Sequence, residues 1–192
     1  MSTLSFKAII GKKVLIIGEV GTRKTAVMAG LLRQAFSLGL SNEISIIDFA
    51  PPRQRVKDLW IGGRLKELIE VPKDVKYFAP RRVEAPRCHA RNAQELMRLA
   101  KLNAQSMTSI IYDYLRDPTP IVFINDVSLL FQAGELDPVL RVLRECETAI
   151  INGYYGEALR EDLGTGVSKR ERELIEKLAE AVDIIFRTPL DS

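Results

Sequence analysis

The chain has 192 residues, 46% of them hydrophobic, which suits a single domain spanning residues 1–192. Lys and Arg number 28 against 25 Asp and Glu, and the net charge of +3 is too small for a dedicated nucleic-acid coat. No apolar run reaches the length of about 18 residues that a membrane span needs. Cys88 and Cys146 lack zinc-ligand spacing even with His89 included, and so few cysteines favour a reduced, cytoplasmic setting.

Short apolar runs alternate with longer amphipathic segments along the chain. This alternation is typical of helices packed on both faces of a parallel sheet. The expected strands lie at residues 13–18, 43–49, 75–79, 120–126 and 182–187. We therefore predict an α/β fold with a mostly parallel sheet of about five strands.

The expected helices carry start and stop signals. The first runs from about Lys24 to Leu38 and stops at Gly39, and a weaker stretch covers residues 64–70. The longest begins at Asn92, which with Glu95 resembles a capping box, and ends before Asp117. Two further helices are expected to begin at Asp137-Pro138 and at Ser168, with Glu171 completing a second capping box.

Residues 147–153, "ETAIING", fit two interpretations. The run could be a strand, but Val142, Cys146, Ala149 and Gly153 continue the helical spacing that begins near Pro138. We prefer the helix. The segment that follows, 152–168, holds four glycines and is interpreted as a lid or a surface excursion.

The stretch "GEVGTRKT", residues 18–25, follows the first apolar strand and opens the first helix. In the pattern G-x-x-x-x-G-K-[ST], backbone N–H groups surround phosphates, the lysine reaches the terminal ones, and the hydroxyl ligates Mg²⁺. The matching residues are Gly18, Lys24 and Thr25, joined by Gly21 and Thr22, which are often seen inside such loops. The alternative is a tight turn with a surface lysine, but the strand-loop-helix context favours a phosphate loop.

These residues resemble the Walker A motif of the P-loop NTPase superfamily. The resemblance implies a P-loop fold that binds ATP with Mg²⁺ through Gly18, Gly21, Thr22, Arg23, Lys24 and Thr25, with Thr25 as a metal ligand. Arg23 departs from the pattern, because a glycine normally stands there. Its guanidinium could act as an internal arginine finger, or it could face solvent or pair with a partner.

A Walker B candidate is "PIVFIND", in which four apolar residues precede Asn125 and Asp126. An acid at the carboxyl end of a buried strand can hold Mg²⁺ near a phosphate loop, so Asp126 is predicted to lie close to Thr25. Its strand is expected beside residues 13–18 or one strand removed. The superfamily commonly has the metal-binding Asp where Asn125 stands, so Asp126 fits either the metal role or the catalytic Glu position. The other interpretation is a cap for a helix starting near Val127.

Other candidates are less specific. Asp48 ends the second strand at the same sheet edge and could orient a water molecule as a catalytic residue, although such an Asp is more often a turn or cap residue. Glu19 is expected to face solvent. The cluster Arg81, Arg82, Arg87 and Arg91 could contact a phosphate, an acidic partner or nucleic acid. Nucleic acid is the weakest of these, because no aromatic residues are interleaved with the arginines.

Two function classes follow. The first is a small Mg²⁺-dependent ATP-binding protein that hydrolyses ATP slowly or with a protein partner. The second is a regulatory module that binds the nucleotide without hydrolysing it, which Arg23 and Asn125 favour. A fainter resemblance links "NDVSLLFQAGELDPVLRVL", residues 125–143, to P-loop corrinoid adenosyltransferases.

Overall fold

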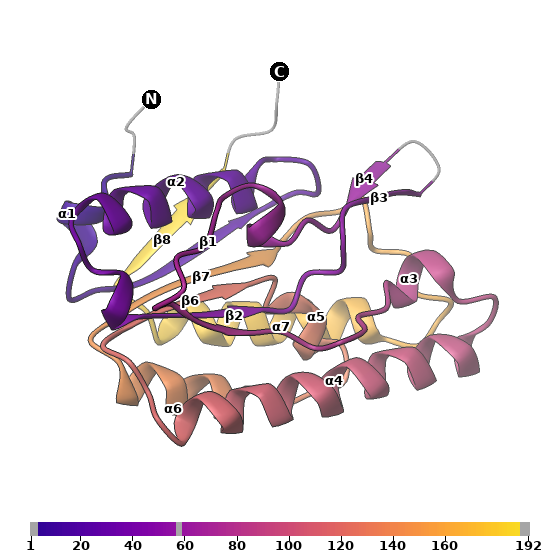
Figure 1. The fold of residues 1–192 in the computed structure, drawn as a ribbon. Coiled ribbons are helices and arrows are strands. Elements are labelled where there is room, and N and C mark those ends of the chain that lie inside the picture. Colours follow the sequence, from indigo (N-terminus) through magenta and orange to yellow (C-terminus); the bar gives the residue numbers. More distant parts are fainter. Residues whose placement is uncertain (1–3, 57–58, 189–192) are drawn as a thin grey trace.

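The computed structural model describes residues 4–56 and 59–188, and its centre is a six-stranded sheet (Figure 1). All neighbouring strands in it run parallel, in the order β5-β2-β6-β7-β1-β8. Its strands are β1 (Lys13–Gly18), β2 (Ile44–Asp48), β5 (Lys76–Phe78), β6 (Ile121–Asn125), β7 (Thr148–Tyr154) and β8 (Ile184–Arg187). The predicted α/β class is confirmed, with one strand more than the five expected.

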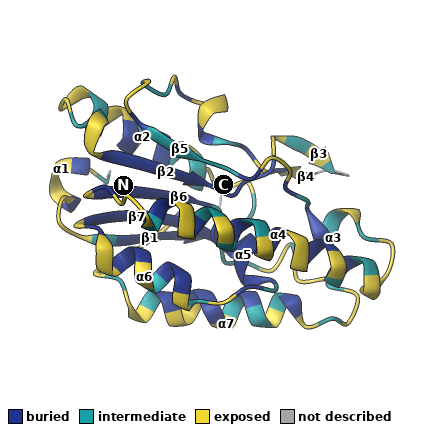
Figure 2. Ribbon diagram, turned by 60° about the horizontal axis from the view of Figure 1, so that its bottom comes forward, coloured by how far each residue is buried: buried dark blue, intermediate teal, exposed yellow. Residues whose placement is uncertain are grey.

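Helices cover both faces of the sheet, as predicted (Figure 1). One face carries α1 (Phe6–Ile9) and α2 (Lys24–Ser37), and the other carries α4 (Ala93–Leu115), α5 (Ser128–Phe131), α6 (Asp137–Glu145) and α7 (Val167–Glu180). Because successive strand residues point to opposite faces, β1 sends Val14 and Ile16 towards α2 and Leu15 and Ile17 towards the other layer. Figure 2 shows the result, with buried strands between helices whose outer faces are exposed.

The sheet order brings several polar strand ends to one edge. β6, which ends in Asn125, is one strand removed from β1, as predicted, and β7 lies between them. Asp48 at the end of β2 is paired in register with Asn125. All strands of a parallel sheet have their carboxyl ends at the same edge. Ligands bind at this edge, at the point where the strand order reverses. The loop at residues 18–25 and the polar ends of β2, β6 and β7 therefore form one site.

The structure corrects the helix predicted for residues 147–153. The helix α6 ends at Glu145, Cys146 is extended with φ −107° and ψ 159°, and β7 follows directly. Residues 148–153 are buried, as a central strand with helices on both faces requires. Thr148, Ile150 and Ile151 are β-branched and favour a strand, so the helical spacing across Cys146 was coincidental.

The structure revises two of the predicted helix starts. Asn92 caps α4 by accepting a hydrogen bond from the Glu95 backbone N–H at 2.8 Å, but the Glu95 carboxylate accepts from the N–H of Arg91 rather than closing the box. The Ser168 prediction is wrong, because α7 begins at Val167 after a left-handed Gly166. The Ser168 side chain donates to the Leu159 carbonyl instead of capping the helix.

A small second sheet was not predicted. The strands β3 (Gln54–Val56) and β4 (Leu59–Ile61) pair antiparallel and lie apart from the main sheet (Figure 1). The weaker helical stretch at 64–70 contains only the 3₁₀ turn η2 (Leu65–Glu67), and two more short elements are η1 (Ser41–Glu43) and α3 (Pro86–His89). The hairpin matters for function because it forms one wall of the cavity described below.

Expectations about membranes, thiols and metals can be compared with the described part of the chain. Within residues 4–56 and 59–188, no helix is both long enough and apolar enough to cross a membrane. Cys88 and Cys146 are free thiols, and burial raises the pKa of Cys146. Within the same ranges, no group of three or more His, Cys, Asp or Glu side chains is arranged to hold a metal ion.

Candidate functional site

The loop at residues 18–25 connects the end of β1 to the start of α2, as predicted. Gly21 has φ +79°, a left-handed conformation that glycine adopts without strain. Gly18 is required for a different reason. A Cβ atom there would collide with the hydroxyl of Thr188 and come within 2.8 Å of the Thr22 hydroxyl, which are themselves hydrogen-bonded at 2.6 Å. Both predicted glycines are therefore needed for the shape of the loop.

Lys24 lies inside the loop rather than on the surface. Its ammonium donates to the carbonyl oxygens of Gly18 at 3.0 Å and Glu19 at 2.5 Å. Burial lowers the pKa of Lys24, while the nearby charges of Asp126 and Glu19 oppose that shift. No side chain caps the N-terminus of α2, so no side chain competes for its first N–H groups. These groups and the positive end of the helix dipole lie beside the half-buried ammonium of Lys24. This arrangement suits an anion.

Arg23 stands at the position where the pattern has a glycine, and its backbone has a left-handed conformation that glycine adopts without strain. Its φ of 62° and ψ of 22° place it in the left-handed region at the N-cap of α2. A residue with a Cβ pays about 1 kcal/mol or more there. Strain of this kind is retained at functional sites, and Arg23 lines the cavity beside the loop.

Asp126 lies at the carboxyl end of β6 and is also left-handed, with φ 62°. Its backbone N–H donates to the Asn152 side-chain oxygen at 2.7 Å, and its carboxylate accepts from the Ser128 hydroxyl at 2.7 Å. Burial raises the pKa of Asp126, against the opposing effects of Ser128 and Lys24. The start of α5 has no side-chain cap, so the geometry does not favour the helix-cap interpretation.

A buried polar network joins the strand ends behind the loop. The side-chain oxygen of Asn125 accepts from the Thr25 hydroxyl at 3.4 Å and from the Asn152 amide at 2.8 Å. The Asn125 amide nitrogen donates to Asp48 at 2.8 Å. Sequence reasoning missed Asn152, because β7 was interpreted as a helix. The polar Asn-Gly at the end of an apolar run was the signal that could have revealed it.

Asp48 is fully buried within this network. Besides Asn125, its carboxylate accepts hydrogen bonds from the Tyr77 hydroxyl at 2.5 Å and from the backbone N–H groups of Ala50 and Leu65. Burial raises the pKa of Asp48, and the hydrogen bond from Tyr77 opposes this. With four donors around it, Asp48 is arranged to hold Asn125 and the turn after β2. The geometry favours the turn interpretation over the catalytic one.

Glu19 does not face solvent as expected. Its carboxylate accepts hydrogen bonds from the backbone N–H groups of Val20, Glu157 and Ala158 at 2.6–3.1 Å. The segment after β7 is thereby tied to the loop at residues 18–25, and its Leu159 N–H donates to the Tyr154 hydroxyl at 2.8 Å. The first three residues of the predicted loop at 152–168 belong to β7, so the loop begins after Tyr154.

The predicted arginine cluster separates into two kinds of residue. Arg81, Arg82 and Arg91 are exposed. Arg87, by contrast, is buried and forms two hydrogen bonds, at 2.9 and 3.0 Å, to the carboxylate of Glu171 on α7. The Gln132 amide nitrogen donates to the same carboxylate at 2.9 Å. Burial raises the pKa of Glu171 to about 7, although the Arg87 charge opposes the shift.

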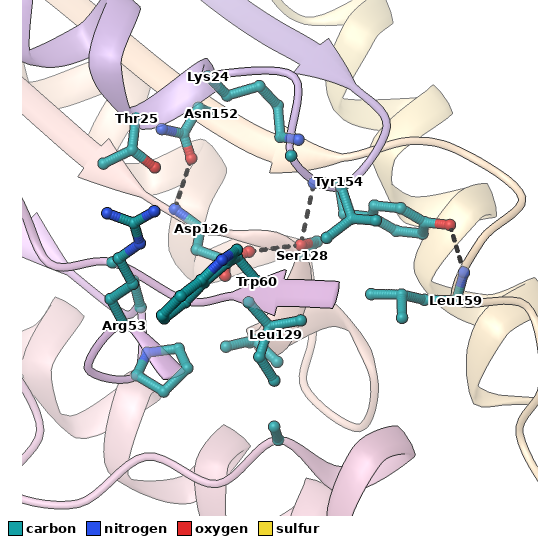
Figure 3. Close-up of a pocket in the computed structure, with 18 of the residues that line it drawn as sticks. Lys24, Thr25, Arg53, Trp60, Asp126, Ser128, Leu129, Asn152, Tyr154 and Leu159 are labelled. Carbon is teal, nitrogen blue, oxygen red and sulfur yellow. Dashed lines mark hydrogen bonds between the residues drawn. The ribbon is translucent and has the colours of Figure 1, made fainter. Parts of the chain in front are cut away.

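These elements surround a cavity of about 680 Å³, within the usual range for small-molecule sites (Figure 3). Lys24, Thr25 and Asp126 lie along one side of it, and Asn152 is beside them. The hairpin contributes Trp60, whose ring lies under the Arg53 guanidinium at 4.5 Å. Among the cavity residues that sequence reasoning missed are Arg53, Trp60, Ser128, Gln132, Asn152 and Tyr154.

A magnesium ion with a phosphate ligand fits the donors present. Mg²⁺ binds oxygen, keeps several waters and typically takes one or two protein ligands beside substrate phosphates. The Thr25 hydroxyl and the Asp126 carboxylate are such oxygens and line the same cavity. Asn125 supplies a neutral oxygen to Thr25 rather than a charge to the metal.

No protein-family model matches the chain, and no curated protein matches it in sequence. Among solved structures, the chain is similar to a prototypical ATPase from the type III secretion system of pathogenic bacteria, at 15% identity and a TM-score of 0.36. The match covers 91% of this chain and 55% of that one, so the chain spans about half the length of that ATPase.

Proposed function

We propose that the protein binds ATP with Mg²⁺ through the loop at residues 18–25, as a P-loop nucleotide-binding protein. The observation that carries this proposal is the position of Lys24. Its half-buried ammonium lies among loop carbonyls, at an uncapped helix N-terminus and on the wall of the cavity. Desolvating an ammonium costs free energy unless an opposite charge compensates it, and a bound phosphate supplies that charge.

Each nearby group has a role in this proposal. The loop N–H groups and Lys24 hold the phosphates, and Thr25 and Asp126 hold the metal. Asp48 fixes Asn125, which in turn receives the Thr25 hydroxyl. The raised pKa of Asp126 also suits a group that accepts a proton from an attacking water molecule.

Two outputs of binding are compatible with these groups. Slow or partner-stimulated hydrolysis is supported by Asp126, whereas binding without hydrolysis is supported by the neutral Asn125 in the place of the expected metal-binding acid. Phosphate release measured with and without Mg²⁺ separates them. The resemblance of residues 125–143 to corrinoid adenosyltransferases stays a prediction.

Calorimetric titration with MgATP tests the proposal. We expect Lys24→Ala to weaken binding at least roughly tenfold, about 1.4 kcal/mol, because the charge on the terminal phosphates is lost. The control is Lys101→Ala, which removes an exposed lysine from α4. Equal affinity in wild type and Lys24→Ala would contradict the phosphate-loop assignment.

A further inference from the structure

The hairpin of β3 and β4 is attached at its base to the strand ends that form the site. The Asn125 amide nitrogen donates to the Gly63 carbonyl at 3.2 Å, and the Gly63 N–H donates to the Pro51 carbonyl at 2.9 Å. A Cβ atom at Gly62 would come within 2.6 Å of the Pro51 carbonyl oxygen, so the two ends of the hairpin meet where only glycine fits. The hairpin is thereby anchored beside the carboxyl ends of β2 and β6.

This anchoring brings the side chain of Trp60 to the cavity. Trp60 is 52% exposed, and it lines the same undivided cavity as Lys24 and Thr25 (Figure 3). The Arg53 guanidinium lies over the Trp60 ring, 4.5 Å from its centroid, in the geometry of a cation–π pair. Arg53 is itself held by its backbone N–H, which donates to the Glu67 carboxylate at 3.2 Å. The ring is therefore supported by Arg53 while about half of the residue stays accessible.

An accessible tryptophan ring with an arginine stacked on it suits a flat aromatic ligand group. Aromatic rings prefer offset-stacked or edge-to-face contacts with one another, and nucleobases stack on aromatic side chains and on arginine whatever their hydrogen-bonding pattern. The two fused rings of the indole match the two fused rings of a purine in area. A chain of phosphates at Lys24 uses charges and N–H groups, so it leaves the hairpin wall without a role.

We propose that Trp60, supported by Arg53, binds a purine ring in the cavity by stacking. The ring comes from one of two sources, the base of the nucleotide whose phosphates the loop holds or a second nucleoside beside that nucleotide. The inference rests on the proposed function for the phosphates at Lys24. The ring site itself rests on Trp60 and Arg53.

Calorimetric titration with adenosine, which carries the ring but no phosphate, tests the site. Trp60→Ala should weaken adenosine binding at least roughly fivefold, about 1 kcal/mol, because the stacking surface is lost. Trp60→Phe should retain most of the affinity, because a phenyl ring still stacks. The control is Tyr112→Ala, which removes an exposed aromatic side chain from α4 and should bind adenosine as wild type does. Thermal unfolding of each variant checks that it is folded.

Fluorescence gives an independent readout in wild type, because Trp60 is the one tryptophan of the chain. Adenosine should quench this fluorescence, whereas ribose, which lacks the purine ring, should not. Failure of wild type to bind adenosine, or equal adenosine affinity in wild type and Trp60→Ala, would overturn the inference.

Adding MgATP identifies the source of the ring, and both results support the ring site. If the ring is the base of the bound nucleotide, saturating MgATP displaces adenosine. Trp60→Ala then also weakens MgATP binding, while its affinity for tripolyphosphate with Mg²⁺ stays as in wild type. If the ring belongs to a second nucleoside, adenosine still binds in saturating MgATP, and Trp60→Ala binds MgATP as wild type does.

The same samples keep the two proposals distinct. Lys24→Ala should bind MgATP more weakly and retain adenosine binding that depends on Trp60. If wild type binds adenosine through Trp60 but binds neither MgATP nor tripolyphosphate with Mg²⁺, the proposed function fails and the ring site stands. If MgATP binds and neither its affinity nor that of adenosine depends on Trp60, the ring site is refuted and the proposed function stands.

Discussion

The buried carboxylate of Glu171 makes the stability of the protein depend on pH in an unusual direction. Burial raises its pKa from the ordinary 4.5 to about 7 in the folded state. A raised pKa means that the folded protein binds the proton more tightly than the unfolded chain does. The resulting stability is fully present below pH 4.5 and is lost as pH rises through 7.

The size of the effect follows from the shift. A change from 4.5 to about 7 corresponds to about 3 kcal/mol of unfolding free energy. For a chain of this length, that is roughly 6–12 °C in midpoint temperature. Asp48 and Asp126 also have raised pKa values and add slopes of the same sign, so the Glu171 contribution must be isolated by comparison.

Glu171→Gln supplies this comparison, because the variant cannot ionise. Below pH 7 the folded wild type carries a protonated, neutral Glu171, which glutamine closely resembles, so the two proteins should have similar stability at pH 5. The informative quantity is the difference in unfolding free energy between wild type and variant, from denaturant titrations at pH 5 to 8. We expect wild type to lose about 2.5 kcal/mol of stability relative to the variant over that range.

Glu180→Gln, at the exposed end of the same helix, is the matched control and should follow wild type at every pH. A difference between wild type and Glu171→Gln that stays constant from pH 5 to 8 would refute the reasoning. An advantage of wild type that grows with pH would mean that the Arg87 charge outweighs burial and lowers the pKa of Glu171.

Two further predictions concern the loop and the metal. Asp126→Asn should keep the fold but lose the Mg²⁺ dependence of ATP binding measured by calorimetry. A destabilised variant whose ATP binding still responds normally to Mg²⁺ would restore the helix-cap interpretation. Arg23→Gly should relieve about 1 kcal/mol or more of left-handed strain, tighten ATP binding and leave turnover equal or higher. A fall in turnover of more than about tenfold at unchanged ATP affinity would show instead that Arg23 stabilises the transition state.

Most of the fold could be predicted from the sequence because the central strands are buried on both faces. The apolar runs in β1, β2 and β6 need no alternation, and their lengths and flanking residues separate them from helices. In β7 the same rule applied, but α6 ends at Glu145 and the strand begins at Thr148. Because the connection is so short, apolar residues of the strand fell by chance at positions that continue the helical spacing of α6.

Site residues could be predicted only where they belong to a motif of consecutive residues in the sequence. Lys24, Thr25 and Asp126 belong to local patterns, and the structure brings them to one cavity. Gln132 and Trp60 reach that cavity from distant segments, and nothing in their local sequence indicates it, whereas Asn152 could have been found once β7 was recognised as a strand. The paired state of Arg87 and Glu171 likewise depends on the packing of α7 against the segment around α3, so the arginine cluster looked like one surface patch.

The central claim is that the loop at residues 18–25 holds nucleotide phosphates, and amide NMR spectra recorded during a MgATP titration test it most directly. The account predicts that the backbone N–H signals of Gly21, Lys24 and Thr25 shift most, together with that of Asp126, because the loop amides donate to the phosphates. MgATP binding that shifts amides elsewhere and leaves these signals in place would contradict it.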